Sequence, residues 1–536
     1  MTPCLLGLDI GTTNAKAVLL NSHGKIMGEA RERYGVSFPR PGWAEQNPEI
    51  WWRAVCRLAH RLKRDAPQAF PRIAAIGVSG QGCPLVALGR NGKCLRPAIL
   101  WLDTRAADET AWMESEAGNL LLRTNGNRVG AYNVEPKALW LRKHEPKIFA
   151  RTFKFLTTVG YVNFRLTGEP VLNHSDGGIL FAYDPARRAW SEELLAKLGI
   201  PQEKYPRLAE CHEVVGKVTP QAAKESGLAP GTLVVAGGED SSSAALAAGA
   251  VEAGQAFLSL GTAAVLGVVL RQRVNEPRLL SFPHVLPGRT LLNGSMSSAG
   301  ASLEWYVRNW YAPAPGTTRN SNPFRALDRE AARSRPGSGA LVFLPYLSGE
   351  LHPILDAQAR AVLFGLALDH RRGDVVRSLM EGCAFAIRHN LTIAEAAEPR
   401  RGEGSAGAVV RVREIHATGG PTKSSLWCQI ISDVTGCQLV LSQAGAPEGS
   451  ALLAGWGAGL MGNPAGLVTE HLQRSRIVQP RRETRDIYDR LFHIYRELYT
   501  RLKDQFPVLR EVRSQLGGKR AAPRRALGEG RRPHAT

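Results

Sequence analysis

The strongest constraint on the fold is a pair of similar stretches about 250 residues apart. Residues 7–20 read Gly-Leu-Asp-Ile-Gly-Thr-Thr-Asn-Ala-Lys-Ala-Val-Leu-Leu, and residues 257–270 read Phe-Leu-Ser-Leu-Gly-Thr-Ala-Ala-Val-Leu-Gly-Val-Val-Leu. Each stretch predicts two short apolar strands joined by a Gly-Thr turn. One such hairpin is an ordinary core element, but two copies predict a duplicated fold with a cleft between its halves.

The turn of the first hairpin carries groups that suit a nucleotide. Asp9 stands at the mouth of the turn, Gly11 permits close approach to the backbone, and the two threonines offer N–H groups and hydroxyls to an anion. Phosphate donors beside a carboxylate that can hold Mg²⁺ suit ATP chemistry. The second turn lacks the leading Asp. We predict that the two turns bind nucleotide through Gly11, Thr12, Thr13, Lys16, Gly261 and Thr262.

Two facing phosphate-binding hairpins resemble the actin-like ATPase fold, in which two RNase-H-like α/β domains surround a central cleft. A chain of 536 residues is long enough for two such domains. The boundary is expected just ahead of the second hairpin, which gives domains at 1–249 and 250–505. Residues 506–536 are rich in Arg, Gly, Pro and Ala and are predicted to form a basic, disordered tail.

The charge of the chain first suggests a nucleic-acid partner, because the net charge is +20. Part of it is local: residues 513–536 hold seven Lys or Arg against one Glu. The remainder shows no aromatic interleaving, so we expect no nucleic-acid partner. No apolar run approaches the roughly 20 residues of a membrane span. The eight scattered cysteines indicate reduced thiols in a cytoplasmic protein; the oligomeric state is open, a homodimer included.

Polar residues follow three predicted buried strands, where sites of α/β proteins collect. The strand at 73–80 leads into Gln81-Gly82-Cys83, the strand at 97–102 into Asp103-Thr104-Arg105, and the strand at 233–236 into Gly237-Gly238-Glu239-Asp240. Phosphoryl transfer to an alcohol needs a base for the hydroxyl proton, and we choose Asp240. A helix N-cap is an equally good interpretation of an Asp before three serines.

Two nucleotide motifs can be set aside. The chain has no Gly-x-x-x-x-Gly-Lys-Ser/Thr sequence. Residues 457–462 spell Gly-x-Gly-x-x-Gly, but they close a predicted helix and do not follow a strand, so helix packing explains these glycines better than a dinucleotide site.

Through about residue 505, the chain resembles the FGGY carbohydrate kinases, and within them the xylulokinases most. The matching stretches occur in the family's order: residues 8–16, 42–48, 96–101, 136–140 (Pro-Lys-Ala-Leu-Trp), 237–240, 258–262, 344–350 (Leu-Pro-Tyr-Leu-Ser-Gly-Glu) and 381–382. The resemblance implies that Asp240 is the general base, that Asp9 positions Mg²⁺ and phosphate, and that Gly419 and Gly420, with Lys423 nearby, lie against the adenosine. It also implies a cleft that closes on the sugar, with the sugar mainly against the N-terminal half, the nucleotide on the C-terminal side, and D-xylulose as the expected substrate.

The chain departs from the family pattern mainly around the sugar. Gln-Met-His of xylulokinases is Gln81-Gly82-Cys83, which removes a His that could bind sugar hydroxyls, and Ser241 replaces the Asn that usually follows the base. Pro421 replaces a third glycine and removes a backbone donor. The acid and the Arg of a further motif are kept as Asp103 and Arg105. We predict sugar contacts from Gln81, Gly82, Cys83, Asp103, Arg105, Asp240 and Ser241, with a surface ion pair as the alternative for Asp103 and Arg105.

Three other functions remain open from the sequence. The nearest is a kinase for another ketose or polyol, such as L-xylulose, ribulose, erythritol or glycerol. The second is a catalytically silent sugar-binding protein on the same fold. The third, an actin-like chaperone, is disfavoured because residues 506–536 are too short and polar to form a peptide-binding domain.

Overall fold

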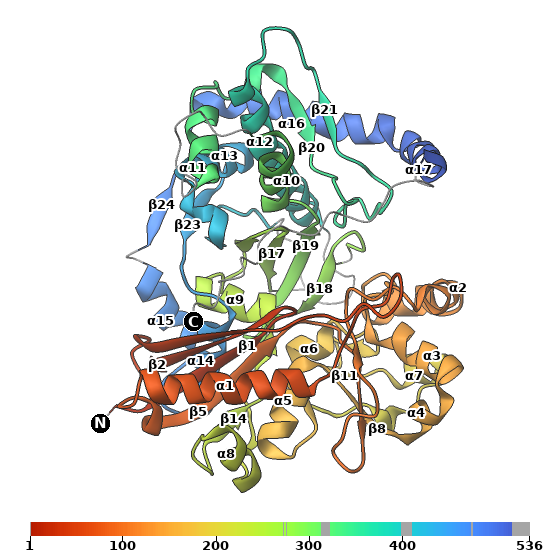
Figure 1. Cartoon of the computed structure of the whole chain (residues 1–536), viewed down its shortest axis with the longest axis vertical. Helices are drawn as coiled ribbons and strands as arrows, with labels where there is room; N and C mark the ends of the chain where they lie inside the picture. The colour runs from red at the N-terminus through yellow and green to blue at the C-terminus, as the bar shows by residue number, and fades with distance from the viewer. Residues whose placement is uncertain are drawn as a thin grey trace, which may run out of the picture.

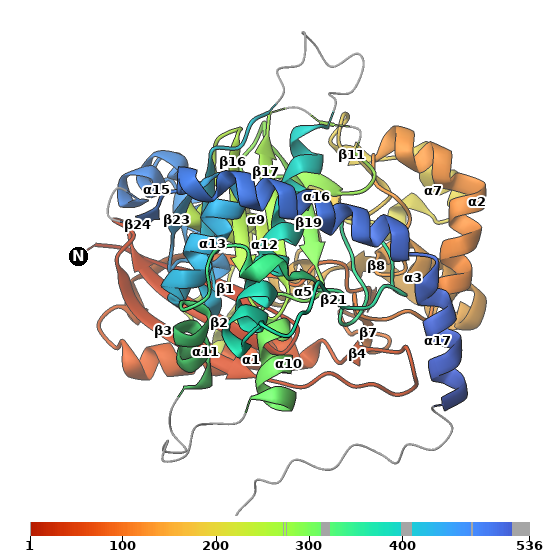
Figure 2. The same ribbon diagram turned by 90° about the horizontal axis from the view of Figure 1, so that it is seen from above.

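The computed structural model describes residues 2–271, 273–274, 276–311, 322–397, 410–472 and 475–516. The N-terminal half forms the lower part of the molecule in Figure 1, and the C-terminal half forms the upper part. Each half contains one mixed seven-stranded sheet with helices packed on it. Figure 2 shows the same arrangement from above, with the helices of the C-terminal half in front of the strands.

The N-terminal sheet is built around the first predicted hairpin. Its strands lie in the order β13-β14-β5-β1-β2-β3, with a short β15 (Gly238–Glu239) pairing with the end of β5. Strands β1 and β2 are antiparallel, and β1 runs parallel to β5. The strand bounds are β1 (Cys4–Ile10), β2 (Asn14–Asn21), β3 (Ile26–Arg33), β5 (Ile73–Gly80), β13 (Val214–Lys217) and β14 (Leu233–Val235).

The C-terminal sheet repeats this plan around the second hairpin. Its order is β18-β19-β17-β16-β22-β23-β24, with β16 antiparallel to β17 and parallel to β22. Six strands of each sheet therefore correspond in order and direction, and the predicted duplicated, actin-like α/β fold is confirmed. The strand bounds are β16 (Gln255–Leu260), β17 (Ala264–Leu270), β18 (Leu280–Pro283), β19 (Thr290–Met296), β22 (Glu414–Thr418), β23 (Gln438–Leu441) and β24 (Arg476–Val478).

Two helices cross between the halves and hold them together. Helix α9 (Asp240–Ala248) leaves the first sheet and packs on β16 and β22 of the second, while α14 (Ala446–Gly457) leaves the second and packs on β1 and β5 of the first. Glycines allow this contact: a Cβ on Gly77 of β5 would lie 2.0 Å from the Ser450 carbonyl oxygen of α14. The predicted boundary at residue 249 therefore separates the sheets but not the helices that cover them.

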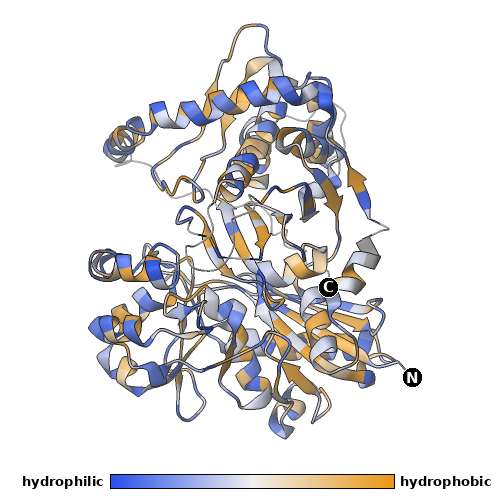
Figure 3. Cartoon of the chain, turned by 180° about the vertical axis from the view of Figure 1, so that it is seen from behind, coloured by the Kyte–Doolittle hydropathy of each residue, from blue (hydrophilic) through white to orange (hydrophobic). Residues whose placement is uncertain are grey.

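The remaining helices cover the outer faces and the flank of the N-terminal half. Helix α16 carries an apolar stripe, whose residues Tyr488, Leu491, Phe492, Tyr495 and Leu498 are buried. Figure 3 shows hydrophilic and hydrophobic residues alternating along this helix. The principal helices are α1 (Glu49–Asp65), α2 (Ala107–Thr124), α3 (Val134–His144), α5 (Thr158–Thr167), α6 (His174–Gly178), α7 (Glu192–Leu198), α10 (Gly300–Trp310), α12 (Arg372–Glu395), α13 (Ser425–Thr435), α15 (Pro464–Leu472) and α16 (Arg485–Leu502).

The C-terminal tail differs from the prediction at its start. Residues Gln505–Leu516 form helix α17, so the prediction of disorder from residue 506 is wrong for this segment. The side chain of Phe506 anchors the helix by packing into the core of the C-terminal half. The rest of the predicted tail, residues 517–536, lies outside the described residues. Within the described ranges, no helix is long and apolar enough to cross a membrane. All eight cysteines are free thiols.

Candidate active site

The first turn holds a buried carboxylate beside an amine. Lys16 Nζ lies 3.6 Å from Asp9 Oδ2, and the Ser79 hydroxyl donates to Asp9 Oδ1 over 3.4 Å. Burial raises the pKa of Asp9 to about 6, the Lys16 charge opposes the rise, and the charge of Asp240 adds to it. Asp9 and Asp240, more than 200 residues apart in the sequence, therefore share one electrostatic environment.

The first turn is held by Gln81, a predicted sugar residue, and by Gln46 and Trp101, which sequence analysis did not assign to the site. The Thr12 hydroxyl donates to Gln81 Oε1 over 3.0 Å and accepts from Trp101 Nε1 over 3.0 Å. Gln46 Nε2 donates to the Thr12 carbonyl over 2.7 Å. Gln81 thus contacts the phosphate turn directly, which links the predicted sugar loop to the predicted nucleotide loop. Thr13 is exposed at the tip of the turn.

The second turn and the predicted adenosine loop lie against each other. Gly419 has a φ of 109°, and a Cβ there would be 1.9 Å from the Leu260 carbonyl oxygen, so only glycine fits. The N–H of Gly300, at the start of α10, donates to the Gly261 carbonyl over 2.8 Å. Thr262 is exposed. The structure therefore brings Gly261, Thr262, Gly419 and Gly420 to one edge of the C-terminal sheet.

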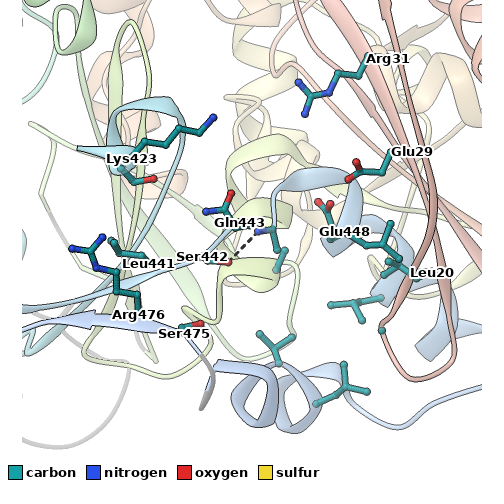
Figure 4. A pocket seen from close by; sticks show the side chains of 18 residues that line it. Leu20, Glu29, Arg31, Lys423, Leu441, Ser442, Gln443, Glu448, Ser475 and Arg476 are labelled. Carbon is teal, nitrogen blue, oxygen red and sulfur yellow. Dashed lines mark hydrogen bonds between the residues drawn. The ribbon is translucent and has the colours of Figure 1, made fainter. Parts of the chain in front are cut away.

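A crevice of about 770 Å³ opens between the two halves beside this edge. Figure 4 shows Lys423, Ser442 and Arg476 on its C-terminal wall and Glu29 and Arg31 on the opposite wall. Lys423 follows Pro421 in a short 3₁₀ turn, η4 (Gly420–Lys423). Of the predicted nucleotide residues, Lys423 is the one that lines this crevice. Because both walls carry cations, the crevice suits an anionic ligand.

Asp240 occupies the first position of α9 and is not its N-cap. The cap is Glu239, whose Oε2 accepts from the Ser242 N–H over 2.9 Å. The Asp240 carboxylate, which is partly buried, accepts a hydrogen bond from the Ser241 hydroxyl over 3.1 Å. Burial and the neighbouring Glu239 raise its pKa well above the ordinary value. The N-cap interpretation thus fits Glu239, and the carboxylate of Asp240 does not cap the helix.

The loop after β5 is held by a buried lysine that sequence analysis missed. Cys83 has a φ of 61°, and its carbonyl accepts from Lys137 Nζ over 2.7 Å. The same amine donates to the Tyr132 carbonyl over 2.5 Å. Burial lowers the pKa of Lys137 to about 8. A Cβ on Gly82 would lie 2.6 Å from Ile179 Cδ1, so a larger residue cannot enter without moving that side chain.

Asp103 and Arg105 form an ion pair, and it is buried. Arg105 Nε and Nη2 lie 2.9 and 2.7 Å from the two oxygens of Asp103, and the Ala44 N–H donates to the same carboxylate over 2.6 Å. The guanidinium carbon lies 3.6 Å from the centre of the Trp43 ring. These partners occupy both oxygens of Asp103, so the ion pair anchors the loop at 43–46. A contact of Asp103 or Arg105 with the sugar stays a prediction.

The donor set can accommodate Mg²⁺ in one way. Among the described residues, no three acidic, His or Cys side chains are grouped as metal ligands. Mg²⁺ in kinases is commonly held by one or two carboxylates, phosphate oxygens and water. Asp9, a single carboxylate beside two phosphate-type turns, fits that requirement.

The fold and these turns define an actin-like phosphotransferase architecture, and comparison with known proteins identifies the family. Residues 4–247 match the N-terminal domain of the FGGY family of carbohydrate kinases, and residues 256–458 match its C-terminal domain. The chain belongs to the FGGY family of carbohydrate kinases.

Individual relatives agree with this assignment. The xylulose kinase of Escherichia coli K12 is 34% identical over 502 residues, which cover 91% of this chain and 99% of that protein. The crystal structure of a xylulose kinase from Brucella ovis superposes with a TM-score of 0.84 at 32% identity, covering 94% of this chain and all of that one. The gluconokinase of Bacillus subtilis is 27% identical and covers 83% of this chain and 85% of its own length.

Proposed function

We propose that this protein is an ATP-dependent kinase that phosphorylates a primary hydroxyl of a ketopentose, with D-xylulose as the first candidate and the cytoplasm as its location. The observation that carries the proposal is the carboxylate of Asp240, which begins α9 without capping it and lies within the electrostatic reach of Asp9 in the first turn. The similarity to xylulose kinases supports D-xylulose, and the similarity to a gluconokinase keeps a second substrate class in view.

The proposed mechanism assigns one task to each group of residues. The turns at Gly11–Thr13 and Gly261–Thr262, with Gly419, Gly420 and Lys423, hold the nucleotide, and Asp9 and Lys16 face its phosphates. ATP with Mg²⁺ supplies the phosphoryl group and offsets its negative charge. Asp240 accepts the proton of the sugar hydroxyl as its oxygen forms a bond to the γ-phosphorus and the bond to ADP breaks.

Gln81 gives the mechanism a means of coordinating its two substrates. It lies in the predicted sugar loop and accepts the Thr12 hydroxyl of the phosphate turn. A sugar that reorients Gln81 releases that hydroxyl for phosphate. Closure of the two halves around α9 and α14 then excludes water from the reacting groups.

ADP release by the purified protein tests the proposal. The panel contains D-xylulose, L-xylulose, D-ribulose, D-gluconate, erythritol and glycerol, each with ATP and Mg²⁺ and again with excess EDTA. We expect sugar-dependent release that EDTA abolishes, with D-xylulose giving the highest kcat/KM. No ADP release above background with any sugar supports the silent-binder alternative, and a preference for another substrate reassigns the sugar within the family.

Asp240→Asn tests the base. The variant keeps the size of the side chain and should bind nucleotide normally, while kcat falls by at least about 10²-fold. Ser243→Ala, three residues further along the same helix, is the matched control because its buried hydroxyl makes no hydrogen bond in the described structure. Near-normal turnover of Asp240→Asn would remove Asp240 from the mechanism.

A further inference from the structure

Asp176 is a buried carboxylate with an unused acceptor. It lies in α6, where its N–H donates to Asn173 Oδ1 and its Oδ2 accepts from Asn173 Nδ2, each over 2.8 Å. Its side chain is fully buried, yet Oδ1 meets no donor in the described structure. A buried carboxylate oxygen without a partner is costly, so its presence calls for a donor that arrives with a ligand.

Helix α6 lies beside the proposed sugar loop. Helix α6 packs against β15, the strand that leads directly into Asp240. Ile179, the residue after α6, fills the space next to Gly82. A Cβ built on Gly82 would lie 3.9 Å from Glu239 Cγ. Burial raises the pKa of Asp176 to about 7, and the charge of Asp240 adds to the rise.

The charge of this region is one-sided. Asp176, Glu239 and Asp240 form a cluster, here called the acidic cluster, and none of them is paired with Lys, Arg or His in the ion pairs of the described residues. The nearby Lys16 faces Asp9, and Lys137 donates to the carbonyls of Cys83 and Tyr132. The cluster therefore offers several carboxyl oxygens, and no cation of the described ion pairs, to anything bound beside it.

Such a subsite favours a ligand with several O–H donors and no negative charge. A ketose or an alditol satisfies the acceptors with its hydroxyls. A sugar acid brings a carboxylate into the same cleft, and like charges in a poorly solvated site repel strongly. The two kinds of substrate named among the relatives, xylulose and gluconate, differ in this property.

We propose that Asp176 is a specificity-determining residue of the sugar subsite: its free oxygen accepts a sugar hydroxyl, and with the acidic cluster it selects uncharged polyhydroxylated substrates over sugar acids. This inference rests on the proposed kinase function. It compensates for the missing His of the Gln81–Cys83 loop, because a hydroxyl partner is supplied from α6 instead.

The test compares two ligand pairs and two variants. Wild type, Asp176→Asn and the control Asp184→Asn are assayed with D-xylulose and D-gluconate. The control changes a half-buried carboxylate whose Oδ1 accepts the Ala186 N–H, a bond that the Asn oxygen can keep. Binding of D-glucitol and D-gluconate to wild type is measured by calorimetry, because these ligands share a hydroxyl pattern and differ by one carboxylate. Circular dichroism checks that each variant folds.

We expect wild type to turn over D-xylulose at least about 100-fold more efficiently than D-gluconate and to bind glucitol more tightly than gluconate. Asp176→Asn should lose at least about tenfold in kcat/KM for xylulose while activity with gluconate stays level or rises, and Asp184→Asn should match wild type. Equal losses for both substrates, or gluconate bound as tightly as glucitol, would overturn the inference. Efficient turnover of gluconate overturns it and leaves the kinase function standing, whereas a protein that binds neither sugar loses both.

Discussion

Gly449 of α14 and Ser243 of α9 touch through their backbones: a Cβ on Gly449 would lie 1.9 Å from the Ser243 carbonyl oxygen. This contact is where the two crossing helices meet. Because it involves backbone atoms, no rotation of a side chain can relieve added bulk there. The close approach of α9 and α14 at this point therefore requires a residue without a Cβ.

Gly449→Ala should force α9 and α14 apart and destabilise the protein by about 1–3 kcal/mol or more. Because Asp240 begins α9, activity should fall together with stability. Thermal unfolding and kcat are the measurements. Gly466→Ala in α15 is the matched control, since it lies in a helix with open space around it and should be neutral or slightly stabilising. Equal melting temperatures for the two variants would contradict the role given to the contact.

Lys137→Met should weaken sugar binding more than nucleotide binding. The substitution keeps the length of the buried side chain but leaves the carbonyls of Cys83 and Tyr132 without their donor, at a cost of about 1–3 kcal/mol for each. The Cys83 loop should then relax from its left-handed conformation. We expect a raised KM for the sugar with a nearly unchanged KM for ATP. An equal rise in both KM values would show that Lys137 serves stability alone.

Glu239→Gln should move the acidic limb of the pH–rate profile to lower pH. Asp240 must be ionised to accept a proton, and its pKa is raised first by burial and then by the charge of Glu239. Gln removes that charge and keeps an oxygen to cap α9, so kcat/KM should begin to rise at a lower pH than in wild type. Glu193→Gln, an exposed change in α7, is the control. An acidic limb at the same pH as in wild type would show that Glu239 does not affect the pKa of Asp240.

Asp176→Asn should stabilise the protein at neutral pH. The pKa of Asp176 rises from an unfolded value of 3.8 to about 7 in the folded state, so the folded protein holds the proton more tightly. Its contribution to stability is complete below about pH 4 and is lost as the pH rises through 7, by an amount of the order of 4 kcal/mol. Unfolding free energies measured from pH 4 to 8 should fall less steeply for the variant. Parallel curves would contradict this prediction.

The duplicated hairpins could be predicted from sequence because the pattern of strand, turn and strand is local. The parallel pairing of β1 with β5 and of β16 with β22 joins distant segments, so it comes from the structure and not from the local pattern. The crossing of α14 onto the first sheet could not be predicted, since its apolar and small residues fit any buried helix. The signal lay in Gly7, Gly77 and Gly449, whose neighbours only the structure reveals.

The site was predicted unevenly for a similar reason. Asp240 was found because it follows a buried strand. The helix cap is Glu239, and only the backbone geometry shows this. Lys137 stands within one of the stretches that match the family. Its burial in α3 is visible only in the structure. Asp176 gave no sequence signal, because a single Asp in a polar segment reveals neither its burial nor its missing partner.

The exchange of α9 and α14 also limits how this protein can be divided. Each sheet takes a covering helix from the opposite half, so a fragment ending near residue 249 would expose the apolar faces of β1 and β5 that α14 protects. If one half were replaced by the corresponding half of a relative, the residues at the contact between α9 and α14 would have to match in both helices. Helices α9 and α14 should therefore be exchanged together, and successful chimeras should join within loops outside these two helices.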